Sequence, residues 1–338
     1  MKHRLLAAAA AFAFSLPVAA QEASPPLSPG EIAAAAPASD WVEIPASDLL
    51  VMDLAPAGKA KKKAPPRRVV IQLMPAPFSQ GWIGNIRKLA AAHWWDGASI
   101  NRVQDNYVVQ WGDATEKKPL PGGVAVVPEA DYTSGLSEWQ ARNAERDAKR
   151  QSRQTSEIPL QRVEPDPYPD WHSRDAYTQW VDFYSGWPVA TSGYGLDQVW
   201  WPVHCYGMLG VGRNLSPDTG NGAELYTVIG HAPRHLDRNI AVVGRVIAGI
   251  EHLSSLPRGT GALGFYEKAE ERVPIKSIRL ATDLPAPSQP KFEYLSTESE
   301  SFTKYADARA NRRDPFFITP AGGADVCNIP VPVRAVSK

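Results

Sequence analysis

Two polar side chains, Arg102 and Gln110, interrupt an otherwise apolar pattern in the stretch INRVQDNYVVQWGD, residues 100–113. Two short apolar segments flank a polar QDN turn, which predicts a β-hairpin. Core strands carry aliphatic residues at such positions, so a guanidinium and an amide here are candidates for chemistry. The sequence shows no G-x-S-x-G motif and no Ser/His/Asp order, and its carboxylates are not visibly paired in apolar settings. This combination fits a reaction that needs neither a nucleophile nor a general base.

Other groups that could hold a ligand lack the required spacing. The segment GMLGVG, residues 207–212, is not a G-x-G-x-x-G motif, and no βαβ pattern surrounds it, so a nucleotide site is not expected. His204, Cys205, His231 and His235 match no zinc-binding pattern, so structural or exposed roles are favoured. We therefore expect no metal and no cofactor.

Composition excludes several classes of protein. Lysine plus arginine and aspartate plus glutamate balance at 36 each, which gives no bias toward nucleic acid or an anionic membrane. The chain has 338 residues and is 43% hydrophobic, enough for a substantial core. Its 31 prolines favour loops and extended connections over a helical bundle.

The N-terminus has the pattern of a secretory signal peptide. A basic start precedes an apolar run at residues 5–16, and the small residues VAA end at Ala20, the expected cleavage point. The apolar run is shorter than the roughly 20 residues that cross a bilayer, so we expect export to the periplasm and no membrane anchor after cleavage. In an oxidising compartment Cys205 and Cys327 could pair, or they could remain two separate buried thiols.

The elements that must position these residues are mostly strands. Residues 21–39 are rich in Ala, Pro and Ser, which predicts a flexible linker. Apolar, β-branched runs at 48–55 and 67–75 predict a hairpin, and residues 81–95 and 249–256 have helical spacing. Further strand-like runs and a strand-poor end with a helical segment at 301–313 complete the pattern. Together they predict an antiparallel all-β barrel with helices capping its ends.

The opening stretch resembles the cyclophilin signature F-H-R-V-x-x-x-F-x-x-Q-x-G-D at its Arg, Val, aromatic, Gln and Gly-Asp positions. Three further blocks resemble that family in the right order: VVIQLMPAPFSQGWIGNIRKLAAAHWWDG, GMLGVGR with GAELYTVIG, and LDRNIAVVGRVIAGIEHLSSL. The resemblance spans roughly 48–112 and 204–258. It implies a closed antiparallel eight-stranded β-barrel capped by two helices. The domain would cover 40–275, with an insertion at about 114–200 and a C-terminal extension, 276–338, packed on it.

The resemblance implies peptidyl-prolyl cis–trans isomerase activity without a cofactor, on X-Pro segments of unfolded or folding proteins. Rotation about an X-Pro bond breaks no covalent bond, so the site only has to hold the proline and stabilise the twisted amide. Arg102 matches the catalytic arginine, and Gln110 matches the partner of the substrate carbonyl. The substrate-binding positions of the family correspond to Tyr107, Val108, Gly212, Arg213, Tyr226 and Leu236.

Several positions depart from the family pattern. Asn101 replaces a histidine, Tyr226 a phenylalanine, His235 a tryptophan, Ile240 a histidine and Glu224 a glutamine. Arg213 also replaces the usual asparagine of the rim. These changes leave a second interpretation open, in which a cyclophilin-like protein binds peptides in the envelope with little or no turnover.

The insertion has two unlike halves. Residues 137–153 form a charged, Ala-rich helical pattern that favours a solvated segment. The second half carries Trp171, Trp180, Phe183, Trp187 and Trp200. So apolar a segment is expected to pack against the barrel or to bind a partner in the cell envelope.

Overall fold

The computed structural model describes residues 25–56, 67–135, 171–194 and 197–336. The predicted signal peptide and the charged helix expected at 137–153 lie outside these residues. The α-helices are α1 (Pro29–Ala35), α2 (Gln80–Ala91), α4 (Glu251–Ser254) and α5 (Glu300–Ala310). The strands are β1 (Trp41–Glu43), β2 (Leu49–Leu54), β3 (Arg67–Leu73), β4 (Ser99–Val103), β5 (Val108–Gly112), β6 (Ser134–Gly135), β7 (Trp180–Tyr184), β8 (Trp187–Ser192), β9 (Val199–Pro202), β10 (Met208–Val211), β11 (Leu225–Val228), β12 (Val242–Ala248), β13 (Val273–Leu280), β14 (Phe292–Leu295) and β15 (Val333–Ala335).

Eight strands form a closed antiparallel barrel in the order β10-β11-β5-β4-β13-β2-β3-β12, which confirms the predicted fold class. The expected hairpin at 48–55 and 67–75 is β2 and β3, with Met52 opposite Val69. Inward-facing aliphatic and aromatic side chains such as Ile71, Ile100 and Trp111 are completely buried. Closure leaves no free sheet edge in the barrel wall.

Two helices follow barrel strands, as predicted, but they differ in size. Helix α2 buries Trp82, Ile86 and Leu89 at helical spacing against the barrel. The second helix, α4, is only four residues long and buries Leu253.

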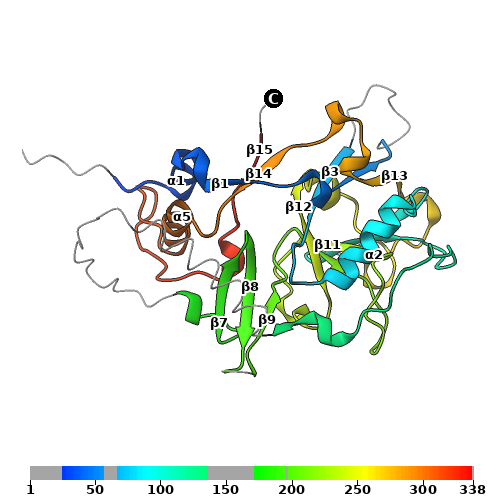
Figure 1. The fold of residues 1–338 in the computed structure, drawn as a ribbon, viewed down its shortest axis with the longest axis horizontal. Helices are drawn as coiled ribbons and strands as arrows, with labels where there is room; N and C mark the ends of the chain where they lie inside the picture. Colours follow the sequence, from blue (N-terminus) through cyan, green and yellow to red (C-terminus); the bar gives the residue numbers. More distant parts are fainter. Residues whose placement is uncertain (1–24, 57–66, 136–170, 195–196, 337–338) are drawn as a thin grey trace, which may run out of the picture.

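The second half of the insertion forms a sheet of its own, in the order β6-β9-β8-β7. Most aromatic residues of this sheet are buried, namely Phe183, Tyr184, Trp187, Trp200 and Trp201, whereas Trp180 is exposed. The ring of Phe183 lies 4.9 Å from that of Phe302 on α5. On the barrel side, the buried Arg245 of β12 donates to the carbonyl of Gly186 at 2.7 Å and lies over the Trp187 ring at 4.5 Å. Burial lowers the pKa of this guanidinium to about 10. The insertion sheet therefore lies between the barrel and the C-terminal extension, as Figure 1 shows.

The N-terminal segment corrects one prediction. Residues 29–35, expected within a flexible linker, form α1, which begins with a capping box between Ser28 and Glu31. Ile32 and Ala33 pack against the core, and Figure 1 shows α1 beside α5 at the end of the molecule away from α2. The alanine-rich composition that indicated a linker also suits a helix, and burial on one face decides the outcome.

The C-terminal boundary also differs from the prediction. Strand β13 runs across position 275 to Leu280 and pairs with β2 and β4, so these residues belong to the barrel. Beyond it, β14 lies between β1 and β15 in a separate three-stranded sheet. Within the ranges that the structure describes, no helix combines the length and apolar character needed to cross a membrane.

Candidate functional site

A β-bulge in β4 turns Arg102 away from the barrel core. Ile100 pairs with Trp111, but the next pair is Arg102 with Gln110, so Asn101 is the extra residue of the bulge. Without the bulge, residues 100 and 102 would point to the same face. With it, Ile100 stays in the core while the arginine joins Gln110 on the outside of the wall.

The candidate side chains form one row across adjacent strands. Arg102 of β4 is opposite Gln110 of β5, which is opposite Tyr226 of β11, which is opposite Gly210 of β10. A side chain at position 210 would collide with the tyrosine ring, because its Cβ would lie 2.2 Å from Cζ of Tyr226. Arg102, Gln110 and Tyr226 of this row line a cleft of about 750 Å³. This cleft brings together all eight residues predicted from the sequence: Arg102, Tyr107, Val108, Gln110, Gly212, Arg213, Tyr226 and Leu236.

The guanidinium of Arg102 is held by neutral oxygens. Nη1 donates to Oε1 of Gln110 at 3.2 Å, Nε donates to the carbonyl of Leu263 at 2.7 Å, and Nη2 donates to Oε1 of Gln104. Its Cζ lies 5.6 Å from the centre of the Tyr107 ring and 5.4 Å from that of Phe265. Burial lowers the pKa of this group from its usual value, but an arginine remains protonated at neutral pH. The site thus presents an oriented cation beside aromatic surfaces.

An apolar pocket adjoins the arginine. Val108, Tyr226 and Val228 are buried together, and Tyr107, Leu236 and Ile240 pack against them. The ring of His235 stacks on that of Tyr107 at 6.2 Å. A pocket with these walls suits a proline ring, which is apolar and offers no N–H group.

The hydroxyl of Tyr226 has a buried partner that the sequence does not indicate. It lies 2.9 Å from Nε2 of His204, and Nδ1 of that ring lies 2.9 Å from a carboxylate oxygen of Asp237. All three side chains are buried. Because a carboxylate only accepts, Nδ1 of His204 donates to Asp237; in the tautomer that carries a single proton on Nδ1, Nε2 accepts from the tyrosine hydroxyl. Burial raises the pKa of Tyr226 well above its usual value, so the hydroxyl stays protonated.

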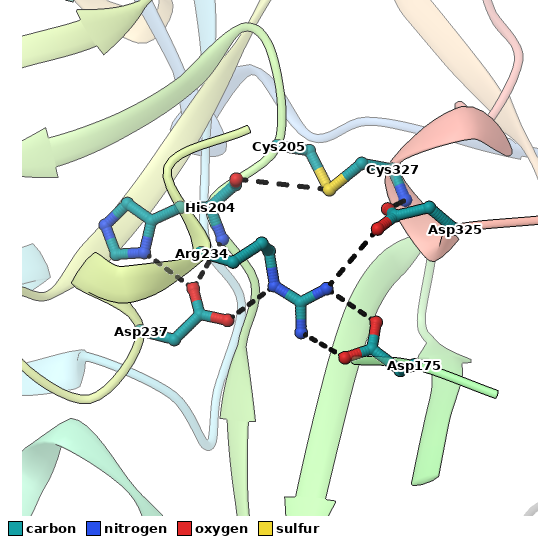
Figure 2. Close-up of a disulfide and its surroundings, with 7 residues drawn as sticks. All are labelled: Asp175, His204, Cys205, Arg234, Asp237, Asp325 and Cys327. Atoms are coloured by element: carbon teal, nitrogen blue, oxygen red, sulfur yellow. Dashed lines mark hydrogen bonds and ion pairs between the residues drawn. A yellow bond between two sulfur atoms is a disulfide. The ribbon is translucent and has the colours of Figure 1, made fainter. Parts of the chain in front are cut away.

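Further charges continue this network toward the insertion and the C-terminal extension (Figure 2). Arg234 donates to Asp237 at 2.7 Å and to Asp175 of the insertion at 2.6 Å. The disulfide between Cys205 and Cys327 lies beside it and joins residues 122 positions apart. The pairing that the sequence left open is therefore present, and it ties the C-terminal extension to the residue after His204.

Two departures from the family pattern, Arg213 and Glu224, lie at the rim of the cleft. The amide of Gly212 donates to the carbonyl of Glu224 at 2.8 Å, and the Arg213 side chain donates to the carbonyl of Asn239 at 2.8 Å. Burial raises the pKa of the Glu224 carboxyl to about 7, although hydrogen bonds from the Gln110 side chain and the Asp113 amide act to lower it. The amide of Gln110 therefore joins Glu224 to Arg102.

Sequence reasoning missed the residues that reach the site from distant segments. Gln104, Leu263 and Phe265 contact Arg102, and His204 holds Tyr226. The only signal was the tyrosine at position 226, since a buried hydroxyl requires a partner. Nothing in the sequence around residues 263 and 265 indicates that they contact Arg102 on β4.

Across the described ranges, no group of three or more His, Cys, Asp or Glu side chains has the geometry to hold a metal ion. The cleft places the Arg102 guanidinium and the amide oxygen of Gln110 beside an apolar pocket, and Arg213 and Arg272 also line it. These groups can bind an extended peptide and stabilise charge or a lone pair on an amide.

Comparisons with known proteins agree with this geometry. Residues 68–280 match the family model described as cyclophilin type peptidyl-prolyl cis-trans isomerase. The crystal structure of the cyclophilin AquaCyp293 from Hirschia baltica is similar in fold, with a TM-score of 0.60 and 20% identity over 87% of this chain and 93% of that one.

A cyclophilin type isomerase from Cryptosporidium parvum, solved in the presence of the dipeptide Ala-Pro, gives a TM-score of 0.34 at 11% identity. It covers 68% of this chain and 98% of that one. The search of curated proteins found no match. With the family model covering most of the chain, the protein belongs to the cyclophilin-type peptidyl-prolyl cis-trans isomerases.

Proposed function

We propose that this protein catalyses cis–trans isomerisation of X-Pro bonds in exported proteins, with Arg102 stabilising the twisted amide. The barrier to this rotation is about 18–20 kcal/mol and comes from amide resonance. Uncatalysed exchange takes tens to hundreds of seconds. As the bond twists, its nitrogen loses conjugation and becomes a better hydrogen-bond acceptor, which an oriented guanidinium stabilises.

The observation that carries the proposal is the row of Arg102, Gln110 and Tyr226 across three strands. It sets a fixed cation on β4 and a pocket wall on β11, with Gln110 of β5 between them, so that cation and wall are two strand spacings of about 4.8 Å apart. Gln110 accepts from the arginine at 3.2 Å and orients it. The pocket wall supplied by Tyr226 keeps water from the prolyl ring.

The test is exchange spectroscopy by NMR on an X-Pro peptide, with the purified protein and its Arg102→Ala variant. We expect the variant to lower the exchange rate at least tenfold while its circular dichroism spectrum is retained. Arg102→Lys keeps the charge but loses the planar fork, so it should recover only part of the rate. An unchanged rate in Arg102→Ala would refute the role given to this residue.

A second candidate function is peptide binding without turnover. It is favoured by the Arg102 contacts, because Nε, Nη1 and Nη2 all have protein partners in the free protein. The same experiment separates the two functions. A pure binder shifts the peptide resonances and leaves the exchange rate at its uncatalysed value.

The place of action is part of the proposal. Residues 1–20 have the pattern of a signal peptide, and a disulfide is stable in the periplasm. In a bacterial host the full chain should be recovered from the periplasmic fraction. Intact mass should place its first residue at Gln21, and a cytoplasmic product that keeps Met1 would contradict export. The insertion remains a candidate surface for an envelope partner.

A further inference from the structure

The loop between α4 and β13, residues 257–272, runs along the strand that carries Arg102; we call it the shelf loop. Two backbone hydrogen bonds join it to β4, from the amides of Gly259 and Tyr266 to the carbonyls of Val103 and Asn101, each at 2.9 Å. These bonds bracket the arginine. The shelf loop is therefore part of the wall of the cleft.

The shelf loop is held in one shape. The buried Tyr266 donates its hydroxyl to the carbonyl of Pro257 at 2.7 Å, and the amide of Gly261 donates to the carbonyl of Phe265 at 2.9 Å. Gly264 has a φ of +79°, and a Cβ there would lie 2.7 Å from Cα of Gln104. Only glycine fits both this conformation and this close approach.

This fixed loop nevertheless exposes two large apolar side chains in the cleft. Leu263 is 67% exposed and Phe265 is 41% exposed, and both line the same cleft as Arg102. An apolar surface held rigidly beside a binding site loses little entropy when a ligand covers it. We call Leu263 and Phe265 together the apolar shelf.

The apolar shelf and the proline pocket lie next to the same guanidinium. The Cζ of Arg102 is 5.4 Å from the ring of Phe265 on the shelf and 5.6 Å from the ring of Tyr107 at the pocket. An extended peptide advances about 3.3 Å per residue. A proline in the pocket therefore places the side chain of a flanking residue within reach of the shelf.

We propose that the apolar shelf is a substrate-recognition surface that selects X-Pro segments with a large apolar side chain next to the prolyl bond. This inference depends on the proposed isomerase function. It names the class of client: unfolded segments in which proline is flanked by Leu, Ile, Phe or a similar residue. Large apolar side chains are mostly buried in folded proteins, so such segments are most accessible while a protein is unfolded.

The test compares kcat/KM for short peptides in which the residues on either side of proline are varied among Gly, Leu and Phe. Leu263→Asn removes the apolar side chain, keeps the backbone carbonyl that accepts from Arg102, and suits the left-handed φ of 56° at this position. Phe265→Ala is the second shelf variant. Ile318→Asn and Phe316→Ala are matched controls, because both residues are exposed on the C-terminal extension.

For the unmodified protein we expect a five- to tenfold preference for Leu or Phe over Gly on at least one side of proline. Leu263→Asn and Phe265→Ala should each reduce this ratio to below about twofold, while the controls leave it unchanged. A flat preference in the unmodified protein, or an unchanged ratio in both shelf variants, overturns the inference.

Failure of the proposed function gives a different result. If the unmodified protein accelerates exchange in none of the peptides, isomerisation is refuted, and the ratio of dissociation constants for the same peptides then tests the shelf. A ratio that favours the apolar peptides and falls in Leu263→Asn supports the shelf as a binding surface. A flat ratio of dissociation constants overturns it.

Discussion

Arg102 and Tyr226 belong to one row of the barrel wall, but the protein holds them in different ways. Arg102 donates to the oxygens of two glutamines and one backbone carbonyl, at the edge of an open cleft. Tyr226 ends a chain of buried side chains that runs through His204 and Asp237 to the ion pairs of Arg234. We call these the open side and the buried side of the cleft.

The difference follows from what each side must do. A carboxylate partner would neutralise the charge of the arginine. Neutral oxygens orient the guanidinium and leave its positive charge available to the substrate. A pocket wall needs only to stay in place, and buried ion pairs are costly to disturb once formed. Substitutions that remove a contact of Arg102 should therefore change rates, and substitutions in the buried chain should change stability.

The largest effect is expected from Arg234→Leu on the buried side. This change leaves the carboxylates of Asp237 and Asp175 buried without their cation, which costs about 3–5 kcal/mol. The free energy of unfolding in urea, measured with the disulfide intact, checks it. The matched control is Lys304→Ala, which breaks an exposed pair with Glu300 and should cost about 0.5 kcal/mol. A loss below about 1 kcal/mol in Arg234→Leu would contradict the buried network.

Glu224, at the rim beside Gln110, gives a pH-dependent test. Burial raises its pKa to about 7, from a usual value of 4.5. Between these two values the folded state keeps a proton that the unfolded chain releases, so stability falls as pH rises through this window. Glu224→Gln should therefore match the original protein at pH 4.5 and exceed it by about 2 kcal/mol at pH 8, allowing for the solvent that reaches this half-buried group.

The ionisation of Glu224 should also appear in the rate. The ionised carboxylate accepts from the Gln110 side chain, which keeps Oε1 of that amide directed at Arg102. We expect kcat/KM to rise as pH passes through about 7, and this step to vanish in Glu224→Gln. Glu270→Gln, at an exposed position, is the control and should keep the step. If Glu224→Gln and the original protein have the same pH profile of kcat/KM, ionisation of Glu224 does not control the rate.

A smaller loss is expected from Tyr226→Phe. The change removes the donor to Nε2 of His204 and leaves a buried acceptor unpaired, at a cost of about 1–2 kcal/mol. Tyr206→Phe removes a hydroxyl from a residue that is 51% exposed and should change stability by less than about 0.5 kcal/mol. Equal effects of the two changes on the free energy of unfolding would show that the bond between Tyr226 and His204 contributes nothing.

The open side could be predicted from the sequence largely because Arg102 and Gln110 are close together in the chain. Arg102 and Gln110 are eight positions apart across a tight turn, and antiparallel pairing sets such residues opposite one another. The bulge at Asn101, which decides that Arg102 points outward beside Gln110, has no signal in the sequence. The contacts of Leu263 and Phe265 could not be predicted either, because they join segments 161 or more positions from Arg102.

For the buried side, the sequence indicates only that a buried tyrosine hydroxyl needs a hydrogen-bond partner, without indicating which residue provides it. The hydroxyl of Tyr226 needed a partner, but His204, Asp237 and Asp175 come from three separate loops. Contacts between distant segments also explain why the linker predicted at 21–39 was wrong for residues 29–35, which form α1. Composition at 21–39 indicates flexibility, and only the contact with α5 supplies the apolar surface that stabilises so short a helix.

The smallest effect is expected from a substitution that removes the aromatic ring of Phe265 but keeps a large apolar side chain. Phe265→Leu keeps a large apolar side chain but removes the ring that lies 5.4 Å from the guanidinium of Arg102. A cation–π contact at a partly exposed site contributes about 0.5–1 kcal/mol, so kcat/KM should fall about two- to fivefold. Because the arginine acts on every prolyl bond, the fall should be the same for Gly- and Leu-flanked peptides. Phe265→Trp should recover the rate. A fall limited to apolar peptides would mean that the aromatic ring acts only by contacting the apolar substrate side chain and that Arg102 keeps its position without the cation–π contact.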